Sequence, residues 1–391
     1  MKPAAVRKSL RPHGRVVPGC VNCLHFADCG GIEPELGLFN TDCVLANCCN
    51  PPSMGGETIV VDCDNVCPRN PKYLELLREV GGNLWFNELP TVSQSAVELP
   101  LYIPLIHHAS KRSQLLDWPT VALDTYHVVG LKNNRMETIE GSADSLREKF
   151  GLSHSSAVIL RGVADDRPLE RYWTYRRRDG VPQQLARLGI TLSVGPNFSH
   201  FLDVPRHDNL FNRKRQLLCL GEFVEAGLNP APHLNASQPG DWRFWGRFLS
   251  VNRSITVVAI EFETGNRSRN QGQRVVAELI ALQQQVGRPL HPLVIGGTQF
   301  LEGIAKEFRA ASFIDSTPFM KAMYRQSFVD LGPTEKFRWR RSPTAPGEQL
   351  DKLNLQNLRC YSEWLDRRWE TVAGEVIKFP SPRKPLAMAT G

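Results

Sequence analysis

Several signatures of common protein classes are missing from this sequence. No apolar run approaches the roughly 18 residues that a membrane-spanning helix requires. The basic segment 1–19 lacks the apolar stretch of a secretion signal, so we expect a cytoplasmic protein with no membrane partner. GxGxxG and Walker-type loops are also absent, which argues against nucleotide binding of those kinds.

Cysteine is scarce beyond residue 70, because eight of the ten cysteines lie in the segment 20–70. Their spacing is C-x2-C-x5-C, then C-x4-C-C, then C-x3-C-P. The segment has too few apolar residues for a core of its own, and a cytoplasmic chain favours thiolate–metal bonds over disulfides. We predict zinc as the cofactor, with an iron–sulfur cluster as the alternative. The predicted metal ligands are Cys20, Cys23, Cys29, Cys43, Cys48, Cys49, Cys63 and Cys67.

The composition is that of a globular protein, with 41% hydrophobic and 22% charged residues. A chain of 391 residues has room for one barrel-sized domain with appendages, or for two ordinary domains. The formal net charge of +7 is compatible with a polyanionic partner.

Eight short apolar runs alternate with helical patterns in the central part of the chain. This alternation predicts an α/β fold with a parallel sheet. Eight strands suit a (β/α)8 TIM-type barrel, which typically takes about 250 residues. A doubly wound open sheet is the alternative, since it shows the same alternation. The predicted strands are Leu101–Ile106, Val121–Asp124, Ala157–Leu160, Thr191–Gly195, Ala231–Leu234, Thr256–Glu261, Leu293–Ile295 and Ser312–Ile314.

The pattern divides the chain into five parts. A basic segment (1–19) and the cysteine-rich metal-binding segment (20–70) precede the barrel (71–330), and a basic, helical extension (331–378) and a disordered tail (379–391) follow it. The predicted helices are Tyr73–Val80, Gly141–Gly151, Leu169–Leu188 (one helix or two), Asn209–Glu225, Arg274–Val286, Gln299–Phe308, one beginning near Pro318, and about Leu350–Val372.

Polar residues follow the predicted strands, at the end of a barrel where sites are built. Carboxylates, imidazoles and amides there suit acid–base or covalent chemistry on a hydrogen-bonding ligand. Each of them is also a common turn or cap residue, and Asp315 in particular either belongs to a site or caps the next helix. The residues that we expect to bind substrate are Asn197, His233, Asn235, Glu261, Gly296 and Gly297.

Three short motifs resemble the tRNA-guanine transglycosylase family. The stretch 294–308, followed by Phe313–Met320, is similar to that family's last two strands, with a GVGTPEDLLEAVA-like segment and then FD and PTR. Ala122–Val128 resembles its NTYHL segment, and Leu101–Pro104 resembles its first strand. Together the motifs span roughly residues 98 to 325.

This resemblance implies a barrel that exchanges guanine in a nucleic acid for a 7-deazaguanine such as preQ0. The reaction proceeds through a covalent bond between an aspartate and the sugar C1′. The nucleophile maps onto Asp315, and a second carboxylate handles the proton of the bases. Asp124 is our candidate for that role, with Asp165 and Asp166 as alternatives.

The sequence also departs from the family pattern. The SGGFQ stretch expected after the third strand is replaced by Arg161–Asp166, and the C-terminal CxCxxC…H zinc site is missing. A divergent branch that resembles the DNA-guanine transglycosylases fits better, so we favour DNA over tRNA as the partner. A non-catalytic nucleic-acid-binding barrel and an iron–sulfur redox enzyme remain the alternatives.

A basic cluster in the extension interleaves cations with Phe337 and Trp339. Cations suit phosphate contacts and aromatic rings suit base stacking. The predicted nucleic-acid-binding residues are Lys336, Arg338, Arg340 and Arg341.

Overall fold

The structure is a computed structural model that describes residues 66, 72–86, 88–201, 204, 206–264, 266–332, 337–345 and 347–378. The eight predicted cysteine ligands, the segment 1–19, the tail 379–391 and Lys336 lie outside the described residues. The predictions made for them therefore stay predictions.

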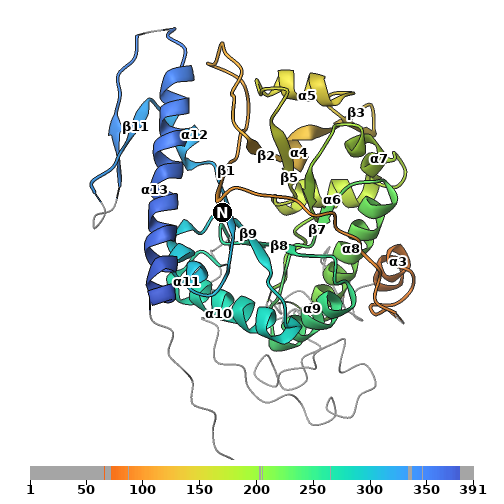
Figure 1. Ribbon diagram of the computed structural model, residues 1–391. Helices are drawn as coiled ribbons and strands as arrows, with labels where there is room; N and C mark the ends of the chain where they lie inside the picture. The colour runs from red at the N-terminus through yellow and green to blue at the C-terminus, as the bar shows by residue number, and fades with distance from the viewer. Residues whose placement is uncertain are drawn as a thin grey trace, which may run out of the picture.

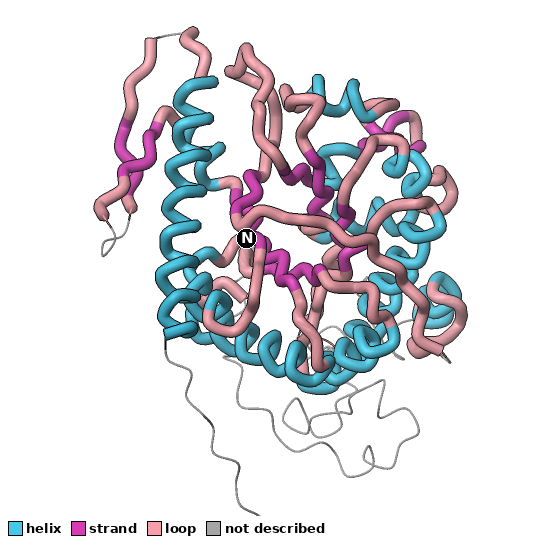
Figure 2. Tube along the Cα trace, viewed as in Figure 1, coloured by secondary structure: helices cyan, strands magenta, loops and turns pink. Residues whose placement is uncertain are grey.

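All of the predicted strands are present, and they pair in parallel. They form two four-stranded sheets, with orders β1-β10-β9-β8 and β2-β5-β6-β7. Two single parallel bridges connect the edges of these sheets (Figures 1 and 2). One pairs Leu105 with Ala122, and the other pairs His233 with Ala259. The strands are β1 (Tyr102–Pro104), β2 (Thr120–Asp124), β5 (Ala157–Arg161), β6 (Leu192–Val194), β7 (Pro230–Ala231), β8 (Val257–Glu261), β9 (His291–Ile295) and β10 (Ser312–Asp315).

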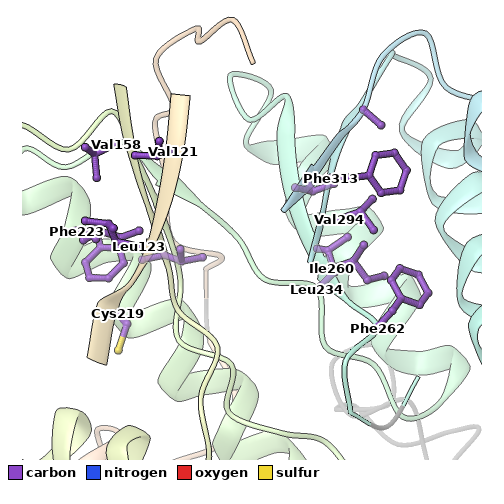
Figure 3. Packing of buried hydrophobic residues seen from close by; sticks show 14 of the residues in the cluster. Val121, Leu123, Val158, Cys219, Phe223, Leu234, Ile260, Phe262, Val294 and Phe313 are labelled. Atoms are coloured by element: carbon purple, nitrogen blue, oxygen red, sulfur yellow. The ribbon is translucent and has the colours of Figure 1, made fainter. Parts of the chain in front are cut away.

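Side chains alternate along each strand between two apolar layers, as the pleat of a strand requires. Leu123 and Phe313 belong to the larger, outer layer, which includes residues of the surrounding helices. Ala122 and Ile314 belong to the smaller, inner layer, formed almost entirely by strand residues. Figure 3 shows members of the outer layer. This alternation decides which way the polar residue at the end of each strand points.

Helices connect the strands, and the predicted helices are confirmed, with the range 169–188 containing most of one helix and all of a second. The sequence analysis missed α9, although Phe244, Trp245 and Phe248 form a buried helical face. No described helix is long and apolar enough to cross a bilayer. The helices are α3 (Tyr73–Glu79), α4 (Thr125–Val128), α5 (Ala143–Lys149), α6 (Asp166–Tyr175), α7 (Val181–Ala186), α8 (Arg206–Glu225), α9 (Pro239–Val251), α10 (Arg269–Val286), η2 (Thr298–Phe300), α11 (Leu301–Ala305), α12 (Thr317–Met323) and α13 (Asp351–Lys378).

Two antiparallel hairpins were not predicted. The first pairs β3 (Val129–Lys132) with β4 (Arg135–Thr138). The two asparagines between these strands have positive φ, as a tight hairpin turn requires. The second pairs β11 (Gln326–Val329) with β12 (Arg338–Arg341), on the outer side of α13 from the parallel strands (Figure 1).

The segment 88–100 covers the amino ends of the strands. Gln94 donates hydrogen bonds to the carbonyl oxygens of Pro230 and Val257, and it accepts others from the backbone N–H groups of Thr256 and Val257. Val97 and Leu99 pack against the inner layer. Because this segment occupies the amino ends, the polar side chains at the carboxyl ends are the ones to consider as a site.

Candidate active site

One arginine joins two carboxylates at the carboxyl ends of the parallel strands. Asp124 ends β2, and by alternation with Ala122 its side chain follows the inner layer. Arg161 is its direct neighbour on β5. Arg161 donates from Nε to Asp124 Oδ1 at 2.5 Å and from Nη1 to Glu263 Oε2 at 2.6 Å. The Asp124 side chain is 8% exposed and that of Glu263 is 34% exposed, so Glu263 is the more accessible of the two.

Two imidazoles face the other oxygen of Asp124. The Nδ1 atom of His107, which follows β1, lies 3.4 Å from Asp124 Oδ2. The Nδ1 atom of His127, in α4, lies 3.5 Å from the same oxygen. The two rings are in an edge-to-face arrangement with centroids 5.8 Å apart.

The carboxyl groups of Asp124 and Glu263 differ in acidity. Burial opposes the ionisation of Asp124, yet His107 and Arg161 outweigh it and lower the pKa of this carboxyl. Burial raises the pKa of Glu263, and the negative charges of Glu261 and Asp124 raise it further against the effect of Arg161. A site that holds two carboxyl groups with pKa values shifted in opposite directions suits one fixed anion and one proton carrier.

Glu261 is committed to the turn after β8. Its Oε2 accepts from the backbone N–H groups of Glu263, at 2.8 Å, and Thr264, at 3.1 Å. Its Oε1 accepts from the Thr264 hydroxyl at 2.6 Å. Glu261, predicted to bind substrate, thus fixes the loop that presents Glu263.

Gly296 and Gly297, also predicted to bind substrate, make room for that loop. Both have positive φ, +69° and +68°. A Cβ on Gly296 would lie 2.8 Å from Glu263 Cγ, and one on Gly297 would lie 2.8 Å from the Phe262 side chain. The structure supports a role for both glycines in positioning the loop.

Replacing Gly296 by alanine is therefore expected to lower the free energy of unfolding by roughly 2–3 kcal/mol, through backbone strain and the clash with Glu263. Gly287→Ala is the matched control, because Gly287 has φ +64° but a Cβ there meets nothing within 4 Å. It should cost only about 1 kcal/mol. Urea denaturation measures both, and equal losses would show that the close approach to Glu263 does not matter.

Asn197, His233 and Asn235 lie together beyond β6 and β7. Asn235 donates from Nδ2 to Asn197 Oδ1 at 2.6 Å and to the Phe198 carbonyl oxygen at 2.8 Å. His233 is buried, and neither ring nitrogen makes a hydrogen bond of ordinary geometry to a described residue. Burial lowers the pKa of His233 to about 4, although the charge of Glu261 acts in the opposite direction. At neutral pH the ring is uncharged and offers one donor and one acceptor.

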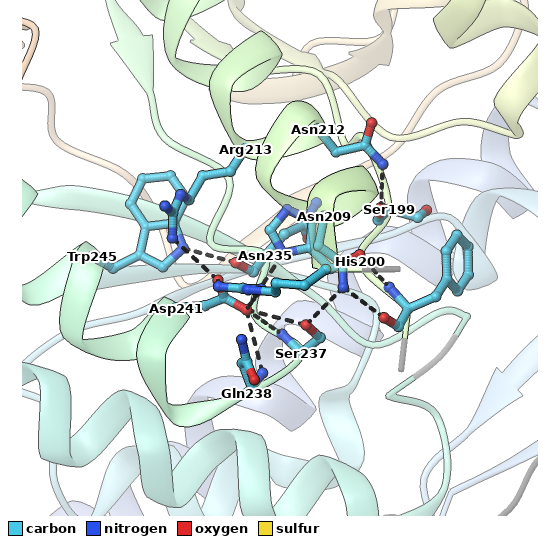
Figure 4. A network of polar contacts seen from close by, with 12 residues as sticks. Ser199, His200, Asn209, Asn212, Arg213, Asn235, Ser237, Gln238, Asp241 and Trp245 are labelled. Carbon is cyan, nitrogen blue, oxygen red and sulfur yellow. Dashed lines mark hydrogen bonds and ion pairs between the residues drawn. The ribbon is translucent and has the colours of Figure 1, made fainter. Parts of the chain in front are cut away.

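A buried ionic network beside these residues was not predicted. Asp241 of α9 is fully buried. Its Oδ1 accepts from Arg206 Nη2 at 2.6 Å and from Arg213 Nη1 at 3.3 Å, and its Oδ2 accepts from the Ser237 hydroxyl at 3.1 Å (Figure 4). Burial opposes ionisation, but Arg206 and His200 hold the pKa of Asp241 well below its usual value. The network connects α8 to α9 close to Asn235.

Among the described residues, no side-chain contact connects Asp315 to the group formed by Asp124, Arg161 and Glu263 (the Asp124 group). It follows Phe313 of the outer layer by alternation. Its Oδ1 accepts from the backbone N–H of Thr317 at 2.7 Å, and its Oδ2 accepts from the hydroxyl of Tyr361 in α13 at 2.6 Å. These contacts connect the strand to α12 and α13. They do not favour the predicted role of Asp315 as a covalent nucleophile.

Arg338, Arg340 and Arg341 are exposed on β12. The hairpin that carries them packs through Phe328, Phe337 and Trp339, whose rings contact one another. The positions are accessible to a polyanion, as the prediction of phosphate contacts requires. The hairpin lies on the outer side of α13, whereas β2, which ends at Asp124, lies among the parallel strands (Figure 1).

The sequence analysis named Asp124 but missed Arg161, the residue that joins Asp124 to Glu263. The register that places Arg161 beside Asp124 was not available from spacing alone. No protein-family model matches the chain and no curated protein matches it, so the resemblance to the transglycosylases rests on the short motifs alone.

Proposed function

We propose that the chain is a base-exchange transglycosylase that replaces guanine in a nucleic acid, with DNA favoured, by a 7-deazaguanine. The observation that carries the proposal is the pair of carboxyl groups on Arg161, an ionised Asp124 and a more weakly acidic Glu263. The motifs that resemble the transglycosylases supply the substrate class. The pair supplies the two groups that the chemistry needs.

The scaffold that we propose is a (β/α)8 barrel. The support is the pairing of two parallel four-stranded sheets, bridged at both ends, with helices outside and a second apolar layer inside. In such a barrel the carboxyl ends of the strands hold the catalytic groups. Asp124, Arg161 and His233 all follow the inner face at that end.

In the proposed first step, Asp124 Oδ2 attacks the sugar C1′ while the bond from C1′ to the guanine nitrogen breaks. The bonding electrons leave with the base, which takes up a proton delivered from solvent through Glu263. In the second step, Glu263 removes a proton from the incoming 7-deazaguanine. The nitrogen of this base attacks C1′ and releases Asp124 as a carboxylate. Glu263 passes this proton to solvent, so protons and charge balance over the cycle.

This scheme moves the covalent bond from Asp315, where the resemblance places it, to Asp124. Both oxygens of Asp315 already hold structural contacts, whereas the contacts of Asp124 Oδ2 among the described residues are two imidazoles at 3.4 and 3.5 Å. Neutral His233, with Asn197 and Asn235, would contact the edge of the base. The target base must leave the stack to reach these groups.

Nucleoside analysis of cells with and without this protein tests the function. We expect a 7-deazaguanine nucleoside in DNA that disappears when the gene is deleted. The same nucleoside in tRNA alone would reverse the preference for DNA. Unchanged nucleosides in both nucleic acids, with binding retained, would instead support the non-catalytic alternative.

Neutralising Arg338, Arg340 and Arg341 together is expected to weaken nucleic-acid binding to the same extent for every sequence. Each lost phosphate contact should flatten the slope of log K against log salt by about 0.7 to 0.9. Binding titrations at several salt concentrations measure the slope. Neutralising Arg135, exposed on the other hairpin, is the control, and an unchanged slope in the triple variant would remove the hairpin from the interface.

A further inference from the structure

We propose that His107, Asp124 and His127 form a binding site for one divalent transition-metal cation of the zinc or cobalt type. The ligand atoms of these three side chains all lie within 4.8 Å of one another. The residues come from the end of β1, the end of β2 and the helix α4 that follows it. Two imidazoles and one carboxylate are ligands that such cations prefer. None of the three residues belongs to the cysteine-rich segment 20–70.

The distances suit a shared cation better than direct hydrogen bonds. The Nδ1 atoms of His107 and His127 lie 3.4 and 3.5 Å from Asp124 Oδ2, beyond the usual 2.7–3.2 Å of an N–H···O bond. Ligand atoms of a tetrahedral site are about 3.3 to 3.5 Å apart when each bond is about 2.0 to 2.1 Å. A simple imidazole–carboxylate pair elsewhere in the chain, His154 with Asp144, is closer, at 3.1 Å.

Arg161 orients the carboxylate for this role. It holds Asp124 Oδ1, so that Oδ2 faces the two imidazoles. Ligating carboxylates are commonly hydrogen-bonded in this way by a residue that does not touch the metal. The side chains of His107 and His127 are 23% and 54% exposed. A cation therefore has a path from solvent, and water can complete its coordination.

The cation and the sugar carbon need the same oxygen, Asp124 Oδ2. If the proposed function holds, an excess of the cation should inhibit base exchange by occupying that oxygen. The binding itself does not rest on the proposed function, because it needs only the three side chains.

The test is cobalt binding to the full-length protein, measured by equilibrium dialysis and visible absorption. Cysteine thiolates are also cobalt ligands, so the result is a difference between variants that share all of the cysteines. We expect wild-type protein to bind one cobalt ion more than His107→Ala or His127→Ala, whose affinity at this site should fall at least about a hundredfold. The difference spectrum should show d–d bands without thiolate charge transfer. His154→Ala and His108→Ala are matched controls and should bind as the wild type does.

Equal cobalt stoichiometry in wild type and both ligand variants would overturn the proposal. So would a difference spectrum with thiolate charge transfer, because the ion would then belong to cysteines. His127 is more than half exposed, so its replacement should leave the fold intact, and thermal unfolding of each variant checks this. Dialysis uses no nucleic acid, so its failure leaves base exchange untouched, just as unchanged nucleosides leave the cation site untouched.

Discussion

Replacement of Asp124 by asparagine is expected to reduce base exchange by at least about a thousandfold. The amide keeps the shape of the side chain but lacks the negative charge that forms the bond to C1′ in the proposed mechanism, and losses of this size are ordinary for a covalent group. Nucleic-acid binding should survive, because Asp124 is 8% exposed and the cations on β12 are elsewhere. Steady-state exchange of a labelled base into an oligonucleotide measures the effect.

Asp315→Asn is the matched control, and the two accounts of the site give it opposite outcomes. The contacts of Asp315 with Thr317 and Tyr361 predict a loss of stability with exchange retained. The resemblance to the transglycosylases predicts the reverse. If Asp315→Asn abolishes exchange in a stable protein while Asp124→Asn does not, the catalytic roles return to Asp315.

Asp241→Asn is expected to cost about 3–5 kcal/mol in the free energy of unfolding, a large share of the stability of a typical domain. The substitution removes the buried negative charge that Arg206 and Arg213 contact at Asp241. Urea denaturation measures the change. Asp144→Asn is the control, because Asp144 pairs with His154 at the surface and should have little effect. A loss below about 1 kcal/mol for Asp241→Asn would mean that the network contributes little.

This contribution should depend on pH with a definite sign. The folded-state pKa of Asp241 lies well below its usual value. Its stabilisation is therefore complete above the unfolded-state pKa of about 3.9 and is lost as the pH falls towards the folded-state pKa. The stability difference between wild type and Asp241→Asn should thus be constant near neutral pH and shrink in acid.

The parallel strands could be predicted from the sequence because each lies in a short, mostly apolar run between turn residues. The hairpin β11–β12 could not be predicted, because the sequence of β12 is a basic cluster that forms a strand only through its pairing with β11. A run of three cations is typical of a solvent-exposed surface, yet the structure buries Arg213, Lys214 and Arg215. The groups that contact these three cations are distant in the sequence, so spacing could not reveal them. They are Phe244, Phe198 and two backbone carbonyl oxygens.

The site was only partly predictable for a related reason. The side chain at the end of a strand points to the inner layer if it lies an even number of residues from an inner-layer residue of that strand. It points to the outer layer if that number is odd. Asp124 lies two residues after Ala122 of the inner layer, whereas Asp315 lies two after Phe313 of the outer layer. A motif places both at strand ends without deciding the direction. The residues grouped around Asp124 and Arg161 come from the segment after β1, from β5 and from the loop after β8, and only the pairing of strands brings these together.

Peptide mapping of the covalent intermediate tests the central claim most directly. Wild-type protein is incubated with a guanine-containing oligonucleotide without the incoming base, denatured, digested and analysed by mass spectrometry. The sugar-linked oligonucleotide should be attached to the peptide that contains Asp124 and should be missing from Asp124→Asn. An adduct on the peptide that contains Asp315 would contradict the assignment of the nucleophile. The absence of any adduct, under conditions where exchange is measurable, would contradict the covalent mechanism.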